Sequence, residues 1–339
     1  MTPARRKPPT FEPAYPAYTV DRKDWKHFAT AIIGVQCPQK EEGLILVGEL
    51  LRMFMADKIG RPLHVERAEY VDLDECHNHI LMPYWTDADH MNKFLGRHDF
   101  EVWRRVPRTG SVGWWMESLW GDTDFTDLSF ANKSLCGVAR HSEHEKMQYH
   151  GYMGSMRDRV PGYLSGEADG IPSKLVRRQS VNSKSRHLII QDLPHNLCYI
   201  RAPFGYKHAP QEQQEAFHEL MMPVLTDATR YLTDNPIDSG CFSMRRVKEV
   251  DAGFDNETQD EVLGWFLTLQ DLERWTEHHP AHLKILRESA AFHKRFNYQA
   301  AINQGHEVFV MPQGQVYCEY VNCHPNTGFL PYFPARVIV

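Results

Sequence analysis

Two histidines in the last quarter of the chain lie on apolar faces of the elements that the sequence predicts. Pro280 is well placed as the first residue of a helix, which puts His282 in its first turn and on the same face as Leu286. His306 belongs to a strand-like run, residues 305–310, in which it alternates onto one face with two valines. Such a pair suits a haem iron, with one imidazole as axial ligand and the other free to move protons on the open side.

Each of these histidines also has a structural interpretation. A lone imidazole on the apolar face of a helix, such as His282, more often makes a hydrogen bond in the core than binds a metal. His306 in its apolar row is either a satisfied core side chain or a general acid and base. His278 and His282 have zinc spacing, but the acidic residue of the HExxH motif is missing and Pro280 interrupts the helix. The sequence therefore gives little support to zinc.

Other segments contain residue types that could act in a site. Residues 149–159 combine two glycines, two arginines and His150, and we expect one helix that packs closely against something flat or large. Residues 319–328 predict a strand that ends in a tight turn. Cys323 and His324 in that turn could be ligands, although a structural turn is favoured. Residues 76–79 also have ligand types but lie at the start of a strand, and we interpret them as structural.

The elements that must carry these residues follow the same order twice. The predicted elements are strand 31–36, helix 41–57, strand 79–85, helix 87–103, strand 196–200, helix 211–231, strand 261–266 and helix 269–292, broken near Pro280. This order indicates two strand-helix-strand repeats, and an accidental match of two α+β stretches is the alternative. We expect turn-rich connections across residues 104–195, with a solvated basic loop at 174–186.

Composition excludes several classes of protein. The 339 residues are 42% hydrophobic and 24% charged, which is ordinary for a globular enzyme. The net charge of −6 gives no electrostatic footprint for nucleic acid. No run of 18 apolar residues predicts a membrane span, and the proline-rich N-terminus lacks the apolar stretch of a secretion signal. Seven dispersed cysteines are typical of reduced thiols, so we expect a cytoplasmic protein.

Four segments together resemble the aldoxime dehydratase (phenylacetaldoxime dehydratase) family of haem-containing lyases. They are residues 150–159, 272–282, 306–308 and 320–329, and the resemblance extends from about residue 31 to residue 331. It implies an α+β protein of the dimeric α+β barrel type, with two fused ferredoxin-like repeats, antiparallel sheets and a haem pocket. The implied division is an extended proline-rich segment (1–25), a first repeat (26–135) and a second repeat carrying the haem site (136–339), within one integrated domain.

The same resemblance implies the activity and the roles of individual residues. The activity is dehydration of an aldoxime, R–CH=N–OH, to a nitrile and water, by a homodimer whose partner is the small-molecule substrate. Haem b is bound without a covalent link, with ferrous iron in the active state and His282 as its proximal ligand. His306 is the acid and then the base, Arg159 holds and polarises the substrate, and His150 supports the site.

This chain departs from the family pattern at two positions. Many members have serine or threonine where Ala202 stands, and that hydroxyl is thought to bind the oxime oxygen. Members can carry a glutamate where Thr126 stands. Loss of one hydrogen bond to a reacting oxygen costs about 1 to 3 kcal/mol. Haem is therefore better supported than the substrate. The alternatives are peroxidase-like or another elimination chemistry on the same fold, a non-catalytic haem-binding protein, and a haem-free α+β ligand-binding protein.

Overall fold

The computed structural model describes most of the chain. The described residues are 5–21, 26–108, 110–131, 136–165, 174–179, 183–251, 254 and 257–338.

The same order of elements occurs twice along the chain. Each run has a strand, a helix, two strands, a pair of helices and a final strand, and the second run has one additional short helix. The first run comprises β2 (His27–Cys37), α1 (Lys40–Met55), β3 (His64–Val71), β4 (His77–Trp85), α2 (Ala88–Leu95), α3 (His98–Arg105) and β5 (Gly113–Asp122). The second run comprises β9 (Leu197–Gly205), α6 (Gln211–Asp234), α7 (Pro236–Ser239), β10 (Cys241–Val250), β11 (Glu257–Phe266), α8 (Leu269–His278), α9 (Pro280–Arg295) and β12 (Asn303–Met311).

Shorter elements flank the two runs. They are β1 (Tyr18–Val20), η1 (Thr123–Phe125), β6 (Thr126–Phe130), η2 (Gly137–His141), β7 (His144–Lys146), α4 (Ser155–Arg159), α5 (Pro161–Leu164), β8 (His187–Ile190), β13 (Val316–Val321) and β14 (Ala335–Ile338). The described strands form one sheet in the order β14-β8-β13-β5-β2-β4-β3-β10-β11-β9-β12-β6-β1-β7. Neighbouring strands pair antiparallel, and the two runs meet where β3 pairs with β10.

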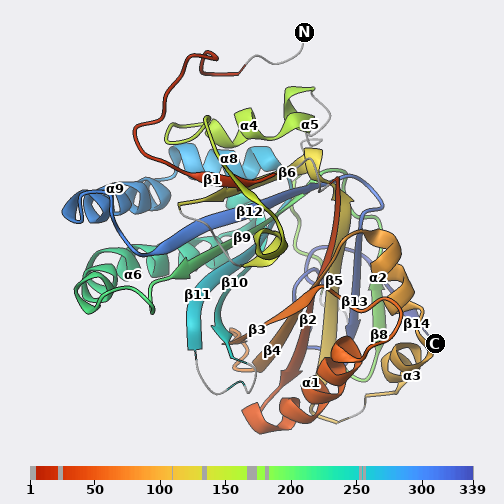
Figure 1. The fold of residues 1–339 in the computed structure, drawn as a ribbon. Coiled ribbons are helices and arrows are strands. Elements are labelled where there is room, and N and C mark those ends of the chain that lie inside the picture. Colours follow the sequence, from red (N-terminus) through yellow and green to blue (C-terminus); the bar gives the residue numbers. More distant parts are fainter. Residues whose placement is uncertain are drawn as a thin grey trace.

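The inner faces of the two runs pack against each other in an extensive apolar core. Phe28 of β2 contacts Phe309 of β12, with ring centroids 4.6 Å apart, and Tyr199 of β9 contacts Trp265 of β11 in the same cluster. Separate apolar clusters lie under the helices on the outer faces. Figure 1 shows α1, α2 and α3 beside the first run and α6, α8 and α9 beside the second.

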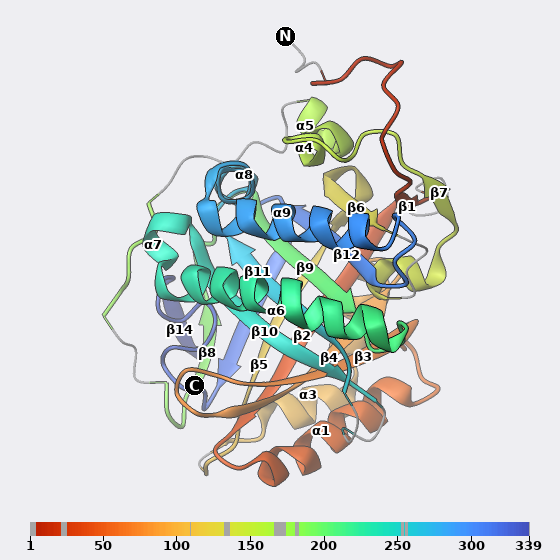
Figure 2. The same cartoon turned by 90° about the vertical axis from the view of Figure 1, so that its left-hand side faces the viewer.

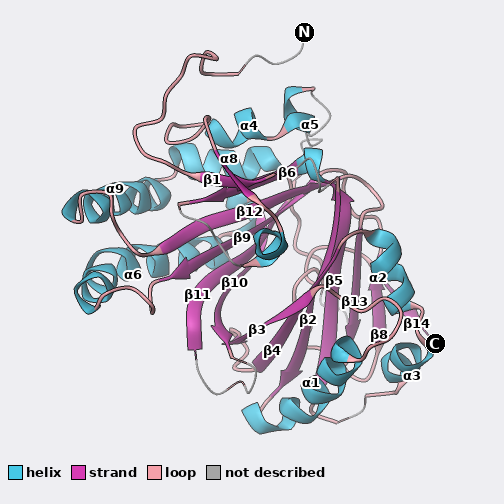
Figure 3. Ribbon diagram, viewed as in Figure 1, coloured by secondary structure: helices cyan, strands magenta, loops and turns pink. Residues whose placement is uncertain are grey.

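The outer face of the second run positions the candidate site. Helices α6 and α9 lie side by side across β9, β10 and β11 (Figure 2). Strand β12 has the alternation that the sequence predicts: Val308 and Val310 pack under these helices, while Phe309 and Met311 belong to the inner core. His306 therefore faces the helices with the two valines. Figure 3 shows the short α4 above α8, at one end of this layer.

Most long elements agree with the sequence-based expectations, and one helix does not. The strands expected at 31–36, 79–85, 196–200 and 261–266 are present, as are the helices expected at 41–57 and 211–231 and the break before Pro280. The single helix expected over 87–103 is wrong. It divides at Gly96, because Arg97 takes an extended backbone and its guanidinium pairs with Asp99 at the start of α3.

The expectation of turn-rich connections across residues 104–195 is also wrong. Strands β5, β6 and β8 lie there, and β5 is buried on both faces because its alternate residues belong to the inner core and to the apolar cluster under the helices of the first run. Residues 149–154 are not helical: Gly151 and Gly154 both have φ of +78°, and only Ser155–Arg159 forms α4. Within the described residues 5–21, the backbone is irregular except for β1, which pairs with β6 and β7.

Among the described residues, none of the helices is long and apolar enough to cross a lipid bilayer.

Candidate functional site

The junction between α8 and α9 places His282. Helix α8 ends at His278, and His279 adopts an extended backbone, with φ −78° and ψ 129°, before Pro280 starts α9. The ring of His279 caps the new helix, because its Nδ1 accepts a hydrogen bond from the backbone N–H of Ala281 at 3.2 Å. His282 therefore lies in the first turn of α9, as the sequence predicts, and lines a cavity under that helix.

A backbone contact fixes the tautomer of His282. Its Nδ1–H donates to the carbonyl oxygen of Thr276 at 2.8 Å, which leaves the lone pair of Nε2 for a metal ion. Burial lowers the pKa of His282 to about 4, so the imidazole is neutral at physiological pH, the form that binds iron. Trp275 lies edge-on to the ring, with centroids 6.0 Å apart.

His306, Arg159 and Asp127 form one hydrogen-bonded group at the same cavity. The Nε2 of His306 lies 2.8 Å from Oδ2 of Asp127. Arg159 donates to the same carboxylate through Nε and Nη2, both at 2.7 Å, which is a bidentate geometry. Nη2 also lies 3.4 Å from Nε2 of His306. Three elements meet here, because these residues belong to β12, to the end of α4 and to β6.

Asp127 holds the other two side chains in place. Burial alone raises the pKa of this carboxyl, but the charges of Arg159 and His306 and their hydrogen bonds more than reverse that effect. They keep the pKa of Asp127 well below its usual range. The ionised carboxylate accepts the Nε2–H of His306, so Nδ1 is the nitrogen left to take up or release a proton.

Sequence reasoning missed Asp127 and named its neighbour, Thr126. The hydroxyl of Thr126 donates to the carbonyl of Thr123 at 2.8 Å, and the side chain is buried. Neither Thr126 nor Asp127 is among the described residues that line the cavity. Successive residues of a strand point to opposite faces, so the acid one position later reaches His306 and Arg159, which do line it. The available signal was an acid between Thr126 and Leu128, since a carboxylate in a buried strand requires a partner.

Ala202 lies at the cavity and His150 lies behind it. Ala202 projects from β9, the strand between β11 and β12, and its methyl group makes the wall apolar beside His306. His150 is buried against Tyr15, with ring centroids 5.1 Å apart. Burial lowers the pKa of His150. The preceding carbonyl, of Tyr149, accepts a hydrogen bond from Arg159 at 2.9 Å, so this segment supports the arginine from outside the cavity.

The cavity fits a haem group. It lies between α6, α9 and the outer face of the second run, and it holds about 1240 Å³ of space between atoms, part of it open to solvent. Aliphatic and aromatic side chains form most of its wall, among them Ile200, Phe204, Leu225, Val262, Phe266 and Ile285. A neutral imidazole with a free nitrogen and a separate group that handles protons both face this apolar space. That donor set suits a flat apolar cofactor with one protein ligand to its iron.

The remaining candidate residues lie elsewhere or have structural partners. His278 is exposed and pairs with Glu277 on the surface. Cys323 is buried with its thiol 3.0 Å from the carbonyl of Trp114, and His324 pairs with Asp74 at 2.8 Å. Among the described residues, no group of three or more His, Cys, Asp or Glu side chains is arranged to hold a metal ion.

The other two segments also have structural contacts. His79 binds the carbonyl of Lys40 at 2.7 Å, as expected for a structural residue. In the described part of the basic loop, Arg177 donates to Asn326 and Arg178 donates to the carbonyl of Tyr332. Residues 180–182 of that loop lie outside the described residues.

Comparisons with known proteins agree with this geometry. A family model described as haem-containing dehydratase matches residues 31–329. The phenylacetaldoxime dehydratase of Bacillus sp. (strain OxB-1) is 27% identical, over 98% of this chain and 96% of the relative. The aliphatic aldoxime dehydratase of Pseudomonas chlororaphis is 28% identical, over 96% of this chain and 94% of the relative.

Solved structures give the same result for the fold. A crystal structure of an aldoxime dehydratase matches with a TM-score of 0.88 at 25% identity, over 98% of this chain and 95% of that one. A second, of an aldoxime dehydratase in complex with butyraldoxime, has a TM-score of 0.89 at 23% identity, over 98% and 93%. They confirm a fold of helices and antiparallel sheet. With a family model that spans most of the sequence, the chain belongs to the haem-containing dehydratase family.

Proposed function

We propose that this protein dehydrates an aldoxime to a nitrile and water, with haem b bound through His282. The observation that carries the proposal is the arrangement of the cavity. A neutral imidazole with a free nitrogen borders one apolar space, and His306 and Arg159, both held by Asp127, border the same space. The relatives named as aldoxime dehydratases support the substrate class.

His282 holds the cofactor in this proposal. Its Nδ1–H bond to the carbonyl of Thr276 orients the ring and makes Nε2 a better electron donor. When bound, ferrous haem would supply an iron that takes the oxime nitrogen and donates electron density toward the N–O bond. The apolar wall keeps water from competing for that position.

His306 carries the proton in both directions. Hydroxide is a poor leaving group, so the oxime oxygen must receive a proton as the N–O bond breaks. The hydrogen on the oxime carbon must then leave as a proton. Nδ1 of His306 can donate the first and accept the second, so the ring ends the cycle as it began and water carries the oxygen away. Asp127 keeps the ring oriented throughout.

Arg159 polarises the substrate in this proposal. Its Nε and Nη2 are fixed by Asp127, and Nη1 binds the hydroxyl of Ser155 and the carbonyl of Tyr149. A guanidinium held at this many points costs little reorganisation when charge develops on the leaving oxygen. Ala202, at the same wall, provides no hydroxyl for that oxygen. The supporting role of His150, which is buried against Tyr15, is to hold the neighbouring carbonyl of Tyr149 that accepts a hydrogen bond from Arg159.

Anaerobic turnover tests this proposal against peroxidase-like chemistry. Protein loaded with haem and reduced by dithionite should convert phenylacetaldoxime or butyraldoxime to the nitrile with neither oxygen nor peroxide present. Oxidation of a dye that requires peroxide, without any nitrile from either aldoxime, would contradict the proposal and favour the alternative activity. Haem binding with neither reaction would favour a non-catalytic haem-binding protein.

We also propose that the two runs are fused ferredoxin-like repeats of the dimeric α+β barrel type. The strand order supports this, because β5-β2-β4-β3 and β12-β9-β11-β10 place the fourth, first, third and second strand of each run in the same sequence. The proposed parts are 1–25, 26–135 and 136–339. Strand β6 of the first part pairs with β12 and β13 of the second part pairs with β5, which supports one integrated domain.

We further propose a homodimer in the cytoplasm. The resemblance supports the dimer, and light scattering of the purified protein tests it. The seven cysteines are dispersed along the chain and six are buried, which suits a reducing compartment.

A further inference from the structure

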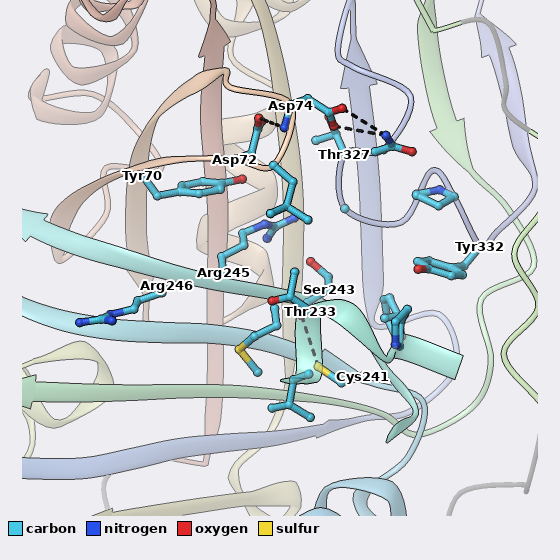
Figure 4. Close-up of a pocket in the computed structure, with 18 of the residues that line it drawn as sticks. Tyr70, Asp72, Asp74, Thr233, Cys241, Ser243, Arg245, Arg246, Thr327 and Tyr332 are labelled. Carbon is cyan, nitrogen blue, oxygen red and sulfur yellow. Dashed lines mark hydrogen bonds between the residues drawn. The ribbon is translucent and has the colours of Figure 1, made fainter. Parts of the chain in front are cut away.

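A second cavity lies where the two runs diverge. Strands β3 and β10 pair only near Glu69 and Lys248, and beyond that point a space opens between the β3–β4 connection and the start of β10. Figure 4 shows Tyr70 and Asp72 on one side of it, and Ser243 and Arg245 on the other. We call this space the seam cavity.

The charged groups of the seam cavity already have partners. Arg245 makes a bidentate pair with the buried Glu117. Asp72 accepts hydrogen bonds from Gln36 and Asn78. Asp74, Arg177 and Arg246, which also line it, have partners as well. Its ionic groups are therefore committed to the fold, and an uncharged chain that enters beside Met244 and Leu232 meets no unpaired charge among these residues.

Two side chains border both cavities. We call the cavity that His282 and His306 line the haem cavity. Leu232, near the end of α6, and Met244 of β10 line both the haem cavity and the seam cavity. Met244 lies across Gly264 of β11, since a Cβ at Gly264 would be only 2.7 Å from its terminal methyl carbon and 3.1 Å from Ile200. The missing side chain at Gly264 thus provides the trough in which the thioether lies. Leu232 and Met244 therefore form a partition between the two cavities. Because methionine is unbranched and flexible, its side chain can change rotamer and open this partition.

The pairing of the strands shows which side chains lie between His306 and this partition. Across β9, β11 and β10, Ala202 pairs with Val262 and Val262 with Arg246. One row further along, Ile200 pairs with Gly264 and Gly264 with Met244. On β9 and β11 the residues in these two rows are apolar or glycine. The path from β12, which carries His306, to β10 crosses three strand spacings, roughly 14 Å.

We propose that Met244 and Leu232 limit the length of the substrate substituent that the site accepts, because their side chains separate the haem cavity from the seam cavity. The inference rests on the proposed function. A substrate whose nitrogen is held beside His306 extends its substituent over Val262 and Gly264 toward β10. Short substituents end before the partition, whereas longer ones must displace Met244 and Leu232 into the seam cavity.

The test is a chain-length series of ligands for the haem-loaded protein. Straight-chain 1-alkylimidazoles, from methyl to decyl, bind haem iron through nitrogen, and titration of the Soret band gives each Kd without turnover. In the parent protein, affinity should rise about fourfold for each buried methylene and stop rising at one length. Met244→Ala and Leu232→Ala should move that limit to longer chains, and Met244→Phe should move it to shorter ones.

Leu225→Ala is the matched control. Leu225 lies on the same helix as Leu232 and lines the haem cavity, but it does not border the seam cavity. The same truncation there should leave the length limit where the parent has it. A limit that is identical in all four variants, or that Leu225→Ala moves as far as Leu232→Ala does, would overturn the inference. A parent protein that takes up no haem would instead refute the proposed function, before any variant is made.

Discussion

Asp127 joins the two side chains on which the proposed chemistry depends. Its carboxylate accepts hydrogen bonds from both Arg159 and His306 in a buried setting. Asp127→Asn keeps the shape but offers one acceptor oxygen in place of two. We expect turnover of an aldoxime to fall roughly 100-fold, since general acid and base catalysis contributes that much or more. Steady-state rates measure the effect, and an unchanged Soret band shows that haem is retained. Parental turnover with that band unchanged would remove Asp127 from the mechanism.

Ala202 offers the converse test, in which a group is added. Ala202→Ser places a hydroxyl at the cavity wall beside His306, where it can bind the leaving oxygen. A net hydrogen bond of about 1 kcal/mol predicts roughly a fivefold rise in turnover. The isosteric pair Ala202→Thr and Ala202→Val separates the hydroxyl from its bulk. If serine and threonine give no gain over alanine and valine, the leaving oxygen does not lie at this wall.

The sequence predicts His282, His306 and Arg159 as candidate site residues, whereas Asp127 was missed. His282 could be placed because Pro280 starts its helix, and His306 because strand alternation assigns its face. Arg159 came from a motif, whose two glycines turn out to form turns rather than a helix. Asp127 could not be assigned, because its partners come from β12 and α4, and no local pattern shows that these elements meet.

At the level of elements, two arginines fasten the segment above the cavity to α8. Arg157 of α4 pairs with Glu273. One helical turn further along α8, Glu277 accepts a hydrogen bond from Arg6 at 3.0 Å. Arg6 also donates to the carbonyl of Met153 at 3.1 Å. Residues of the N-terminal segment therefore help to hold α4, which carries Arg159.

Gly154 makes room for this contact. A Cβ at that position would lie 1.9 Å from the guanidinium of Arg6, and its φ of +78° also favours glycine. We expect Arg6→Ala to increase deuterium uptake across residues 149–159 while the Tm changes little, because the Arg6 side chain is 44% exposed and its pair with Glu277 is open to solvent on that side. Lys7→Ala is the control, since Lys7 lies over aromatic rings and makes no bridge to α8. Equal uptake in the two variants would contradict this role.

The elements that sequence patterns missed have charged residues facing inward. Strands β3 and β10 carry Glu66 and Arg245 on buried positions, and neither strand shows an apolar alternation. Their charges are satisfied by distant residues, Arg201 and Glu117. Long elements with regular apolar spacing could be predicted, whereas these strands depend on pairing that only the folded chain reveals.

On the scale of the whole molecule, a buried charge cluster lies between the two runs, on the sheet face opposite the haem cavity. Arg201 is fully buried and pairs with Glu66 and Glu261. Glu307, next to His306 but on the other face of β12, lies 3.7 Å from the same guanidinium. Its carboxylate also accepts a hydrogen bond from the backbone N–H of Val138 at 2.7 Å. More carboxyl groups than cations meet here, so the charge of Arg201 does not fully offset the effect of burial, which raises the pKa of a carboxyl group.

Glu307 makes the stability of the fold depend on pH. Burial raises its pKa to about 7 from 4.5, against the opposing charge of Arg201. Between these values the folded chain binds more protons at this group than the unfolded chain does, so its contribution to the free energy of unfolding falls as the pH rises. Glu307→Gln removes that dependence. Relative to the parent, the variant should gain at most about 3 kcal/mol between pH 5 and pH 8. Urea unfolding at both pH values measures it, and a constant difference between the two proteins would contradict the prediction.

In the proposed site, His282 binds the iron of haem while His306 accepts and donates protons in the same cavity. The most direct measurement is the absorption spectrum of the parent, His282→Ala and His306→Ala after supply of haemin and reduction, followed by addition of an aldoxime. We expect a haem spectrum and nitrile from the parent, no retained haem in His282→Ala, and a haem spectrum without nitrile in His306→Ala. A colourless parent, or His282→Ala with the parental spectrum, would rule out His282 as the ligand of a haem iron.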